Sequence, residues 1–311
     1  MSDSTEQNKS NWEKFQAEMK RMVEEEVKGK TPEELKMTYK GIRYPSSLCS
    51  VPSFEAMERF EAREDDVLII TYPKCGTHWS KTILHEMLLE VHGKEPTVDR
   101  IMFEFGKPEK YENLEQQPSP RVLASHLAYE NVPKSFFAKK TKILIIMRNP
   151  KDAAVSYYHF TNNLPVLPTY SSWDLFFKDF ISGDVLFGSY FDYHLGWDRH
   201  IDDGNILVLT FEDMKADLPA ELKKINDFYG LNLTDEQILQ IEEKTIFKSM
   251  KEKSSNTHGK LADAFFRKGE IGDWKSLFTE EQSKEVDAKF EKYLAGTKLG
   301  EKINYRKFCT F

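Results

Sequence analysis

The sequence is poor in cysteine, in long apolar runs and in apolar residues near its N-terminus. Its three cysteines, Cys49, Cys75 and Cys309, lie far apart, and an odd number leaves no complete disulfide framework. Reduced thiols are typical of cytoplasmic proteins. Apolar runs such as 143–147 are too short to cross a bilayer, and residues 1–14 lack the apolar core of a secretory signal. We therefore expect a cytoplasmic protein with no membrane partner.

The sequence also lacks an excess of positive charge. Its 44 Lys and Arg residues face 51 Asp and Glu residues, and the formal net charge is −7. This balance argues against a nucleic-acid partner, because nucleic-acid binding depends largely on cations that neutralise phosphates. A polyanionic ligand must therefore be bound by a local group of cations beside a loop.

Short apolar runs alternate with amphipathic segments along the chain. The pattern predicts strands at 67–71, 121–125, 143–147 and 206–211, and helices at 79–91, 151–160 and 212–229. This alternation is typical of an α/β fold with a central, mostly parallel sheet flanked by helices. We interpret residues 31–311 as a single domain. The polar residues 1–30 form an N-terminal extension, for which a peripheral helix and a disordered start are both consistent.

The segment TYPKCGTHW, residues 71–79, joins the first strand to a helix. The first N–H groups of a helix have no partner within it and attract anions, and Gly76 lets a phosphate approach the backbone closely. Lys74 adds a positive charge and Thr77 a hydroxyl donor. This P-loop-like unit does not match the Walker pattern, in which lysine follows the second of two glycines. At this point a solvated lysine beside an ordinary turn explains the loop equally well.

Cys75 is a second candidate in this loop. A phosphatase-type cysteine loop would have arginine six residues after the cysteine, and Lys81 stands there. We therefore interpret Cys75 as a backbone position and not as a nucleophile.

Other polar residues follow the later strands. Arg148 lies at the carboxyl end of strand 143–147, where open α/β sheets place their ligands, and Ser156 lies two turns into the next helix. His126 follows strand 121–125. Arg267 and Lys268 are adjacent in the irregular segment 254–276, and long irregular stretches are usually functional or disordered. Taken singly, Arg148 is equally consistent with a pair to an acidic neighbour, and a lone histidine is more often structural.

Three motifs together resemble the cytosolic sulfotransferase family. TYPKCGTHW is similar to that family's 5′-phosphosulfate loop, RNPKDAAVSYYHF to its 3′-phosphate motif, and FFRKGEIGDWKSLFT to its C-terminal signature. The resemblance extends from about Tyr39 to the C-terminus, and its details are most similar to the vertebrate family-6 branch. It implies sulfuryl transfer from 3′-phosphoadenosine 5′-phosphosulfate (PAPS) to the hydroxyl or amine of a small acceptor, with 3′-phosphoadenosine 5′-phosphate (PAP) as the product.

The resemblance also implies the site residues. His126 corresponds to the family's catalytic base, and Lys74 would neutralise the departing phosphate oxygen. The residues expected to bind the cofactor are Lys74, Cys75, Gly76, Thr77, His78, Trp79, Arg148, Ser156, Phe211, Thr245, Phe247, Met250, Phe265, Arg267, Lys268 and Gly269. Aromatic residues of an acceptor pocket are expected to be Phe103, Phe105, Tyr158, Phe160 and Tyr193, with segment 162–173 as a lid. These side chains suit a flat aromatic or steroid-like acceptor without choosing among phenol, sterol, iodothyronine and amine. No metal is expected, because His85 and His92 lack acidic or cysteine partners.

The sequence departs from the family pattern at several positions. Ala124 replaces a lysine that stabilises the transferring group in many members, which leaves a catalytically weak or inactive PAP-binding relative as an alternative. Phe211 replaces a tyrosine, so one hydroxyl contact is missing. Glu280 and Lys284 degrade the family's dimer motif, which weakens the expectation of a homodimer. A nucleotide kinase is a further alternative, although a Walker loop and acidic magnesium ligands are not evident.

Overall fold

The computed structural model describes residues 17, 20–99, 101–246, 249–250 and 267–311. A five-stranded sheet has the order β4-β5-β3-β6-β7, and every neighbouring pair is parallel. A separate antiparallel hairpin is formed by β1 and β2. The strands are β1 (Lys36–Tyr39), β2 (Ile42–Pro45), β3 (Val67–Thr71), β4 (Thr97–Val98), β5 (Arg121–Ser125), β6 (Lys142–Met147) and β7 (Ile206–Thr210).

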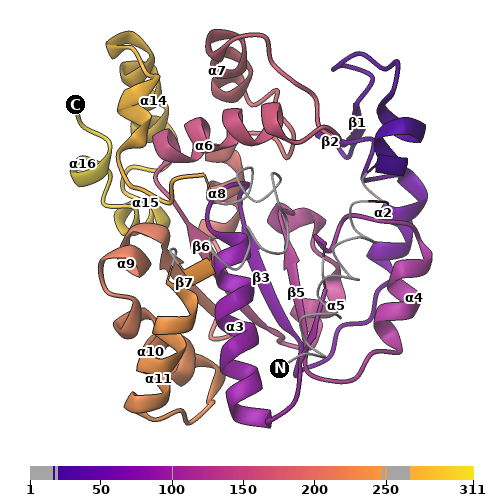
Figure 1. The fold of residues 1–311 in the computed structure, drawn as a ribbon. Coiled ribbons are helices and arrows are strands. Elements are labelled where there is room, and N and C mark those ends of the chain that lie inside the picture. The colour runs from indigo at the N-terminus through magenta and orange to yellow at the C-terminus, as the bar shows by residue number, and fades with distance from the viewer. Residues whose placement is uncertain (1–16, 18–19, 100, 247–248, 251–266) are drawn as a thin grey trace.

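Helices cover both faces of this sheet (Figure 1). The helices of the first two thirds of the chain are α2 (Val51–Glu58), α3 (Thr77–His92), α4 (Glu109–Glu115), α5 (Lys134–Ala138), α6 (Pro150–Asn163), α7 (Trp173–Ser182) and α8 (Tyr190–Asp198). The later helices are α9 (Phe211–Ala216), α10 (Leu218–Tyr229), α11 (Asp235–Thr245), α14 (Glu280–Tyr293), α15 (Lys298–Lys302) and α16 (Tyr305–Phe308). Short helical turns are η1 (Val23–Val27), η2 (Tyr129–Asn131) and η4 (Asp273–Ser276).

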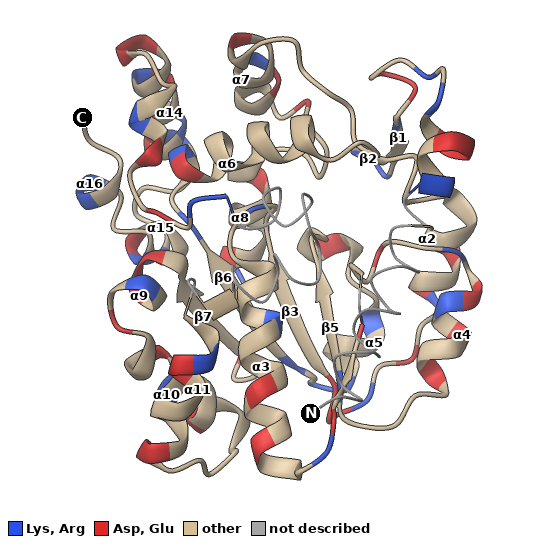
Figure 2. Cartoon of the chain, viewed as in Figure 1, with Lys and Arg blue, Asp and Glu red and all other residues tan. Residues whose placement is uncertain are grey.

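The two faces of the sheet bury two apolar clusters. Alternate residues of β3 point to opposite sides: Val67 and Ile69 pack with α3, α10 and α11, whereas Leu68 and Ile70 pack with α2, α6 and α8. Because both faces are covered, every residue of β3 and β5 is buried. Charged residues lie mainly on the outer helices (Figure 2). The expected α/β fold with a parallel sheet is confirmed.

The largest correction to the sequence-based boundaries lies at 212–229, and α6 runs three residues beyond the expected 151–160. Segment 212–229 is two helices, α9 and α10, and not one. Asp217 accepts a hydrogen bond from the backbone N–H of Ala220 and begins α10, and Pro219 follows in the first turn. A proline ring inside a continuous helix would clash with the carbonyl four residues earlier, so the chain breaks there. The preceding strand ends at Thr210, one residue early, because the Thr210 hydroxyl caps α9 at Asp213.

The N-terminal extension is described only in part. Residues 20–27 are helical, and Met22, Val23 and Val27 pack against the apolar cluster on the α6 side of the sheet. Residues 1–16, 18 and 19 of this extension lie outside the described residues. The division into an extension and one domain stays a prediction. Among the described residues, no helix is long and apolar enough to span a bilayer.

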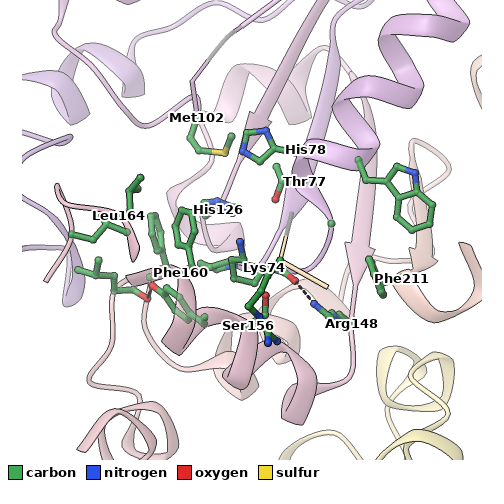
Figure 3. A pocket seen from close by; sticks show the side chains of 18 of the residues that line it. Lys74, Thr77, His78, Met102, His126, Arg148, Ser156, Phe160, Leu164 and Phe211 are labelled. Carbon is green, nitrogen blue, oxygen red and sulfur yellow. Dashed lines mark hydrogen bonds between the residues drawn. The ribbon is translucent and has the colours of Figure 1, made fainter. Parts of the chain in front are cut away.

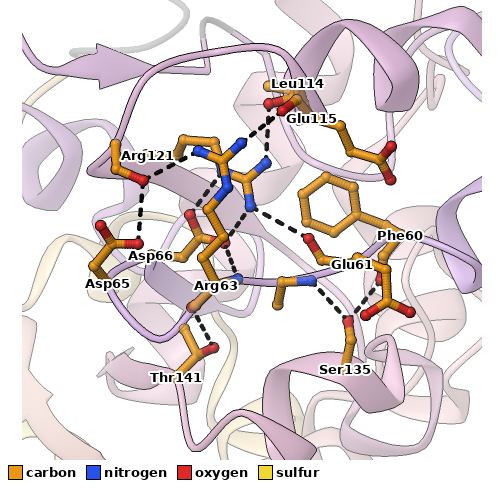
Figure 4. Close-up of polar contacts among 12 residues, drawn as sticks. Phe60, Glu61, Arg63, Asp65, Asp66, Leu114, Glu115, Arg121, Ser135 and Thr141 are labelled. Carbon is orange, nitrogen blue, oxygen red and sulfur yellow. Dashed lines mark hydrogen bonds and ion pairs between the residues drawn. The ribbon is translucent and has the colours of Figure 1, made fainter.

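Strand β5 begins at a buried ion pair between Arg121 and Asp66 (Figure 4). Both side chains are fully buried, and the guanidinium also donates to the carbonyl oxygen of Leu114 at 2.9 Å. The Asp66 carboxylate accepts a further bond from the backbone N–H of Arg63 at 2.8 Å. The pair fixes the start of the strand whose other end carries His126.

Arg121→Met is expected to lower the free energy of unfolding by about 3–5 kcal/mol, because it leaves the Asp66 carboxylate buried without its cation. Urea unfolding of the purified chain measures this loss. Adding Asp66→Asn to the same variant removes the orphaned charge and is expected to restore part of the stability. A loss below about 1 kcal/mol for Arg121→Met would show that the pair is not a major stabilising contact.

Candidate active site

A cavity of about 250 Å³ opens where the carboxyl ends of β3, β5 and β6 meet (Figure 3). The chain places β4 and β5 on one side of β3 and then crosses to β6 and β7 on the other side. Such a reversal of strand order leaves a crevice in which α/β proteins bind ligands. The loops after β3, β5 and β6 contribute Lys74, His126 and Arg148 to the lining of this cavity.

The loop between β3 and α3 leaves the start of α3 without a side-chain cap. Gly76 precedes α3 with φ of 110°, and as a glycine it offers no capping side chain to the first turn. A Cβ atom at Gly76 would lie 3.3 Å from a ring carbon of Phe211, so a larger residue would crowd the loop as well as strain it. Lys74 also has a positive φ, 69°. The loop is therefore shaped to bind an anion at the start of α3.

Cations gather at the end of the cavity beside the loop between β3 and α3, which we call the cationic end. Lys74, Arg148, Arg267 and Lys268 all line it. Burial, followed by the charges of Arg148 and Arg267, lowers the pKa of Lys74 to about 7. The Lys74 ammonium lies 4.0 Å from the centre of the Phe160 ring, a cation–π contact. Arg267 and Lys268 both pair with Asp273. Because these cations repel one another, a bound polyanion would relieve the cost of bringing them together.

Arg148 is held in place by three contacts. Its guanidinium donates to the carbonyl oxygens of Lys74 at 3.2 Å and Glu270 at 2.9 Å, and it lies 4.4 Å from the centre of the Phe211 ring. Its Nε atom is buried and has no hydrogen-bond partner in the described part of the chain. A buried donor without a partner is costly, and a ligand oxygen in the cavity would satisfy it.

His126 presents one ring nitrogen to the cavity. Its Nδ1 atom lies 2.8 Å from the carbonyl oxygen of Thr71. Since a carbonyl can only accept, Nδ1 carries the proton and Nε2 of the neutral ring keeps its lone pair. Burial, followed by the charges of Lys74 and Lys81, lowers the pKa of His126 to about 4, although the Thr71 bond opposes this. The ring is therefore neutral and able to accept a proton at physiological pH.

The opposite end of the cavity is apolar. Its lining side chains come from the segments before α2, before α4, at the end of α6 and before α8; they are Leu48, Ile101, Met102, Phe105, Phe160, Leu164, Val166, Leu167, Leu186 and Phe187. We call this set the apolar lobe. The two ends of segment 162–170 are joined by Asn162. Its side-chain oxygen accepts from the N–H of Tyr170, and its side-chain N–H donates to the carbonyl oxygen of Tyr170. Lys74 and His126 lie between the apolar lobe and the cationic end (Figure 3).

The structure places most of the residues predicted from sequence in this one cavity. Those that line it are Lys74, Gly76, Thr77, His78, Trp79, His126, Arg148, Ser156, Phe211, Arg267, Lys268 and Gly269, together with Phe105 and Phe160 from the expected acceptor pocket. Thr245 and Met250 are buried behind it, and the Thr245 carbonyl accepts a bond from the Trp79 indole at 2.8 Å. Phe247 and Phe265 lie outside the described residues.

Four expected site residues lie elsewhere. Phe103 packs edge-on against Phe60 and Phe136, and Tyr158 packs against Trp173 and Phe176. Tyr193 is buried against Tyr72 and His194. Cys75 points away from the cavity lining into the apolar core, and burial raises the pKa of its thiol, so the interpretation as a backbone position stands as an expectation. The three aromatic residues pack against other aromatic side chains, because residue type alone does not distinguish a core position from a cavity position.

Several lining residues were missed by the sequence analysis. Leu48, Ile101, Met102, Leu186 and Phe187 come from loops that no local pattern marks. Glu104, which is fully buried and contacts the backbone of His126, was also missed. A single carboxylate between two aromatic residues, in the run MFEF at 102–105, was the available signal.

Residues 64–298 match the family model of the sulfotransferase domain. The chain belongs to the sulfotransferase family. Sulfotransferase 6B1 of Mus musculus is 46% identical over 286 residues, which cover 92% of this chain and 94% of the relative. Sulfotransferase 6B1 of Danio rerio is 44% identical over 295 residues, covering 94% and 99%. The crystal structure of mouse sulfotransferase SULT7A1 complexed with PAP is 33% identical with a TM-score of 0.79, covering 88% of this chain and 99% of the other.

This sulfotransferase uses PAPS as its donor and releases PAP. The residues fit the nucleotide: an uncapped helix start, four lining cations and an unpaired buried Nε on Arg148 all suit its phosphates. The expected resemblance to the vertebrate family-6 branch is confirmed. The enzyme takes a small-molecule acceptor, as sulfotransferases do. The cytoplasmic location, the homodimer, and the absence of metal, nucleic-acid and membrane partners stay predictions.

Proposed function

We propose that the enzyme sulfonates a hydroxyl group of a small, largely apolar acceptor, with His126 as the general base. The observation that carries this proposal is the position of His126 and Lys74 between the apolar lobe and the cationic end of one cavity. An acceptor in the apolar lobe would present its hydroxyl to the His126 Nε2 atom, whose lone pair the Thr71 bond keeps free.

The cationic end would bind the nucleotide. The bound donor supplies an activated sulfuryl group whose leaving group is a phosphate oxygen. The first N–H groups of α3, with Lys74 and Thr77, would hold the phosphosulfate, and Arg148, Ser156, Arg267 and Lys268 would hold the 3′-phosphate. Trp79 and Phe211, which pack edge-on with ring centres 5.4 Å apart, offer apolar surface to the adenine.

The acceptor proton and the developing negative charge then lie on opposite sides of the transferred sulfur. His126 takes the hydroxyl proton as the acceptor oxygen bonds to sulfur, while Lys74 offsets the negative charge that develops on the leaving side. Both groups are partly buried, so their charges act in a medium of lower dielectric constant than water and interact more strongly there. The apolar lobe excludes water, which favours transfer to the acceptor over hydrolysis.

Transfer of radiolabelled sulfate from PAPS to a panel of phenols, steroids, iodothyronines and amines tests the proposal. We expect apolar hydroxylated acceptors to be labelled, and Phe105→Ala to raise their KM by about 10-fold or more, because about 1.5–3 kcal/mol of apolar contact is lost. Phe137→Ala, a matched change on α5 outside the cavity lining, should leave KM unchanged. Exclusive labelling of charged, polar acceptors would contradict the proposed acceptor class.

A further inference from the structure

Strand β5 ends at a second buried carboxylate, that of Glu104. One oxygen of Glu104 accepts a bond from the backbone N–H of His126 at 3.0 Å. The other accepts a bond from the hydroxyl of Ser125 at 2.8 Å. The Ser125 oxygen in turn accepts from the N–H of Leu127 at 3.1 Å. The three residues at the turn that carries the catalytic ring are thus all tied, directly or through Ser125, to one side chain.

Glu104 also belongs to the segment that builds the apolar lobe. Met102 and Phe105, on either side of it, line the cavity. The N–H of Phe103 donates to the carbonyl oxygen of Ala124 at 2.7 Å, so the segment runs against the end of β5. The Lys110 ammonium holds the same segment by bonds to the carbonyls of Met102 at 2.7 Å and Phe105 at 3.0 Å. Glu104 therefore joins the acceptor wall to the turn at His126.

The cost of placing this carboxylate here is large. Glu104 is fully buried, and burial raises its pKa to about 7 even though the bonds from Ser125 and His126 and the charge of Lys110 oppose the shift. A buried acidic group that only tied two loops together could be replaced by an apolar contact at lower cost. In the described part of the chain, the polar contacts of the His126 ring are those of its Nδ1 atom with Thr71. The ring also packs edge-to-face with Phe187, with ring centres 5.1 Å apart.

We propose that Glu104 is a positioning residue for the transfer reaction: its carboxylate fixes the backbone at His126 relative to the Met102–Phe105 wall, and so sets the distance between the His126 ring and a bound acceptor. The role is indirect, because Glu104 contacts the backbone of His126 and not its ring. This inference rests on the proposed function of His126 as the base. A displacement of the base by about 1 Å can cost on the order of 100-fold in rate, so Glu104 acts on turnover and not on donor binding.

The test uses the full chain and compares Glu104→Ala with Glu104→Gln. Glu104→Ala is expected to lower kcat by about 10- to 100-fold while the Kd for PAP, measured by calorimetry, stays within about two-fold of the wild-type value. Glu104→Gln keeps an oxygen for the His126 N–H and offers an amide N–H to Ser125, so it is expected to restore most of the rate. Wild-type kcat in Glu104→Ala, or an equal loss in Glu104→Gln, would overturn the inference.

A matched control separates positioning from general loss of stability. Asp66→Asn weakens the buried pair at the other end of the same strand, and its melting temperature should fall while kcat per folded molecule, with the folded fraction taken from circular dichroism, stays at the wild-type value. If Asp66→Asn loses as much kcat as Glu104→Ala, strand stability explains the result and the inference is wrong. If Glu104→Ala does not fold, Ser125→Ala takes its place, with an expected several-fold loss of kcat and unchanged PAP binding.

His126→Ala distinguishes failure of this inference from failure of the proposed function. Full turnover in His126→Ala would remove the base itself, and with it both proposals. An inactive His126→Ala beside a fully active Glu104→Ala would leave the proposed function intact and overturn the positioning role alone.

Discussion

Replacing His126 with alanine should lower kcat by about 10²–10⁴-fold, the usual contribution of a general base. The reason is that, among the described residues, the only other histidine that lines the cavity is His78, which lies on the first turn of α3 beside the donor loop. PAP affinity should be unchanged, because the cationic end of the cavity is intact. Single-turnover transfer measured beside PAP calorimetry separates the chemical step from donor binding.

His92→Ala is the matched control for this variant, since His92 lies exposed at the end of α3. It should retain wild-type kcat. The pH dependence offers a second check: with a pKa lowered to about 4 by burial, His126 is already deprotonated at neutral pH, so its protonation should reduce kcat only as the pH falls toward 4. Retained turnover in His126→Ala would contradict the assignment of His126 as the base.

Lys74→Met should produce the second large effect, a loss of about 100-fold or more in kcat together with weaker PAP binding. The methionine side chain fills similar space against Phe160 but carries no charge. Negative charge developing on the leaving phosphate oxygen would then lack its nearest cation. Steady-state transfer assays and PAP titration of the two proteins measure both losses.

The pKa of Lys74 makes this prediction dependent on pH. Burial, followed by the charges of Arg148 and Arg267, lowers the pKa of Lys74 to about 7, so the ammonium is increasingly deprotonated above that pH. An anionic ligand binds the charged form better, and binding must therefore take up a proton at higher pH. We expect wild-type PAP affinity to decrease as the pH rises from about 7 toward 9.

In Lys74→Met this part of the pH dependence should disappear, because the titrating group is gone. Lys284→Met, the same substitution at an exposed position on α14, is the control and should keep both the wild-type affinity and its pH dependence. An unchanged pH dependence in Lys74→Met would assign the effect to another group.

Local sequence patterns predicted much of the fold. The buried strands β3, β5 and β6 were predicted within one residue, because continuous apolar runs bounded by turns are a strong local signal. The hairpin β1–β2 and the two-residue strand β4 were missed, since short, half-exposed strands have no such pattern. The break between α9 and α10 was also missed, although Asp217 and Pro219 marked it in the sequence.

The cationic half of the active site could be read from the sequence, and the apolar lobe could not. Lys74, Gly76, Arg148 and Arg267 stand in contiguous motifs, each with its own loop chemistry. Phe103 and Phe105 show why residue type does not predict the apolar lobe. They are two residues apart and both aromatic, yet Phe103 packs in the core and Phe105 lines the cavity.

The sequence by itself determined the α/β fold, the phosphate-binding loops and the family, because these depend on residues that are neighbours in the chain. Only the tertiary structure decided which apolar side chains line the cavity, and which buried groups contact the turn at His126. The Glu104 carboxylate and the His126 N–H are 22 residues apart in the chain and 3.0 Å apart in space. Such contacts depend on the register of loops packed across the ends of parallel strands, and no local pattern encodes that register.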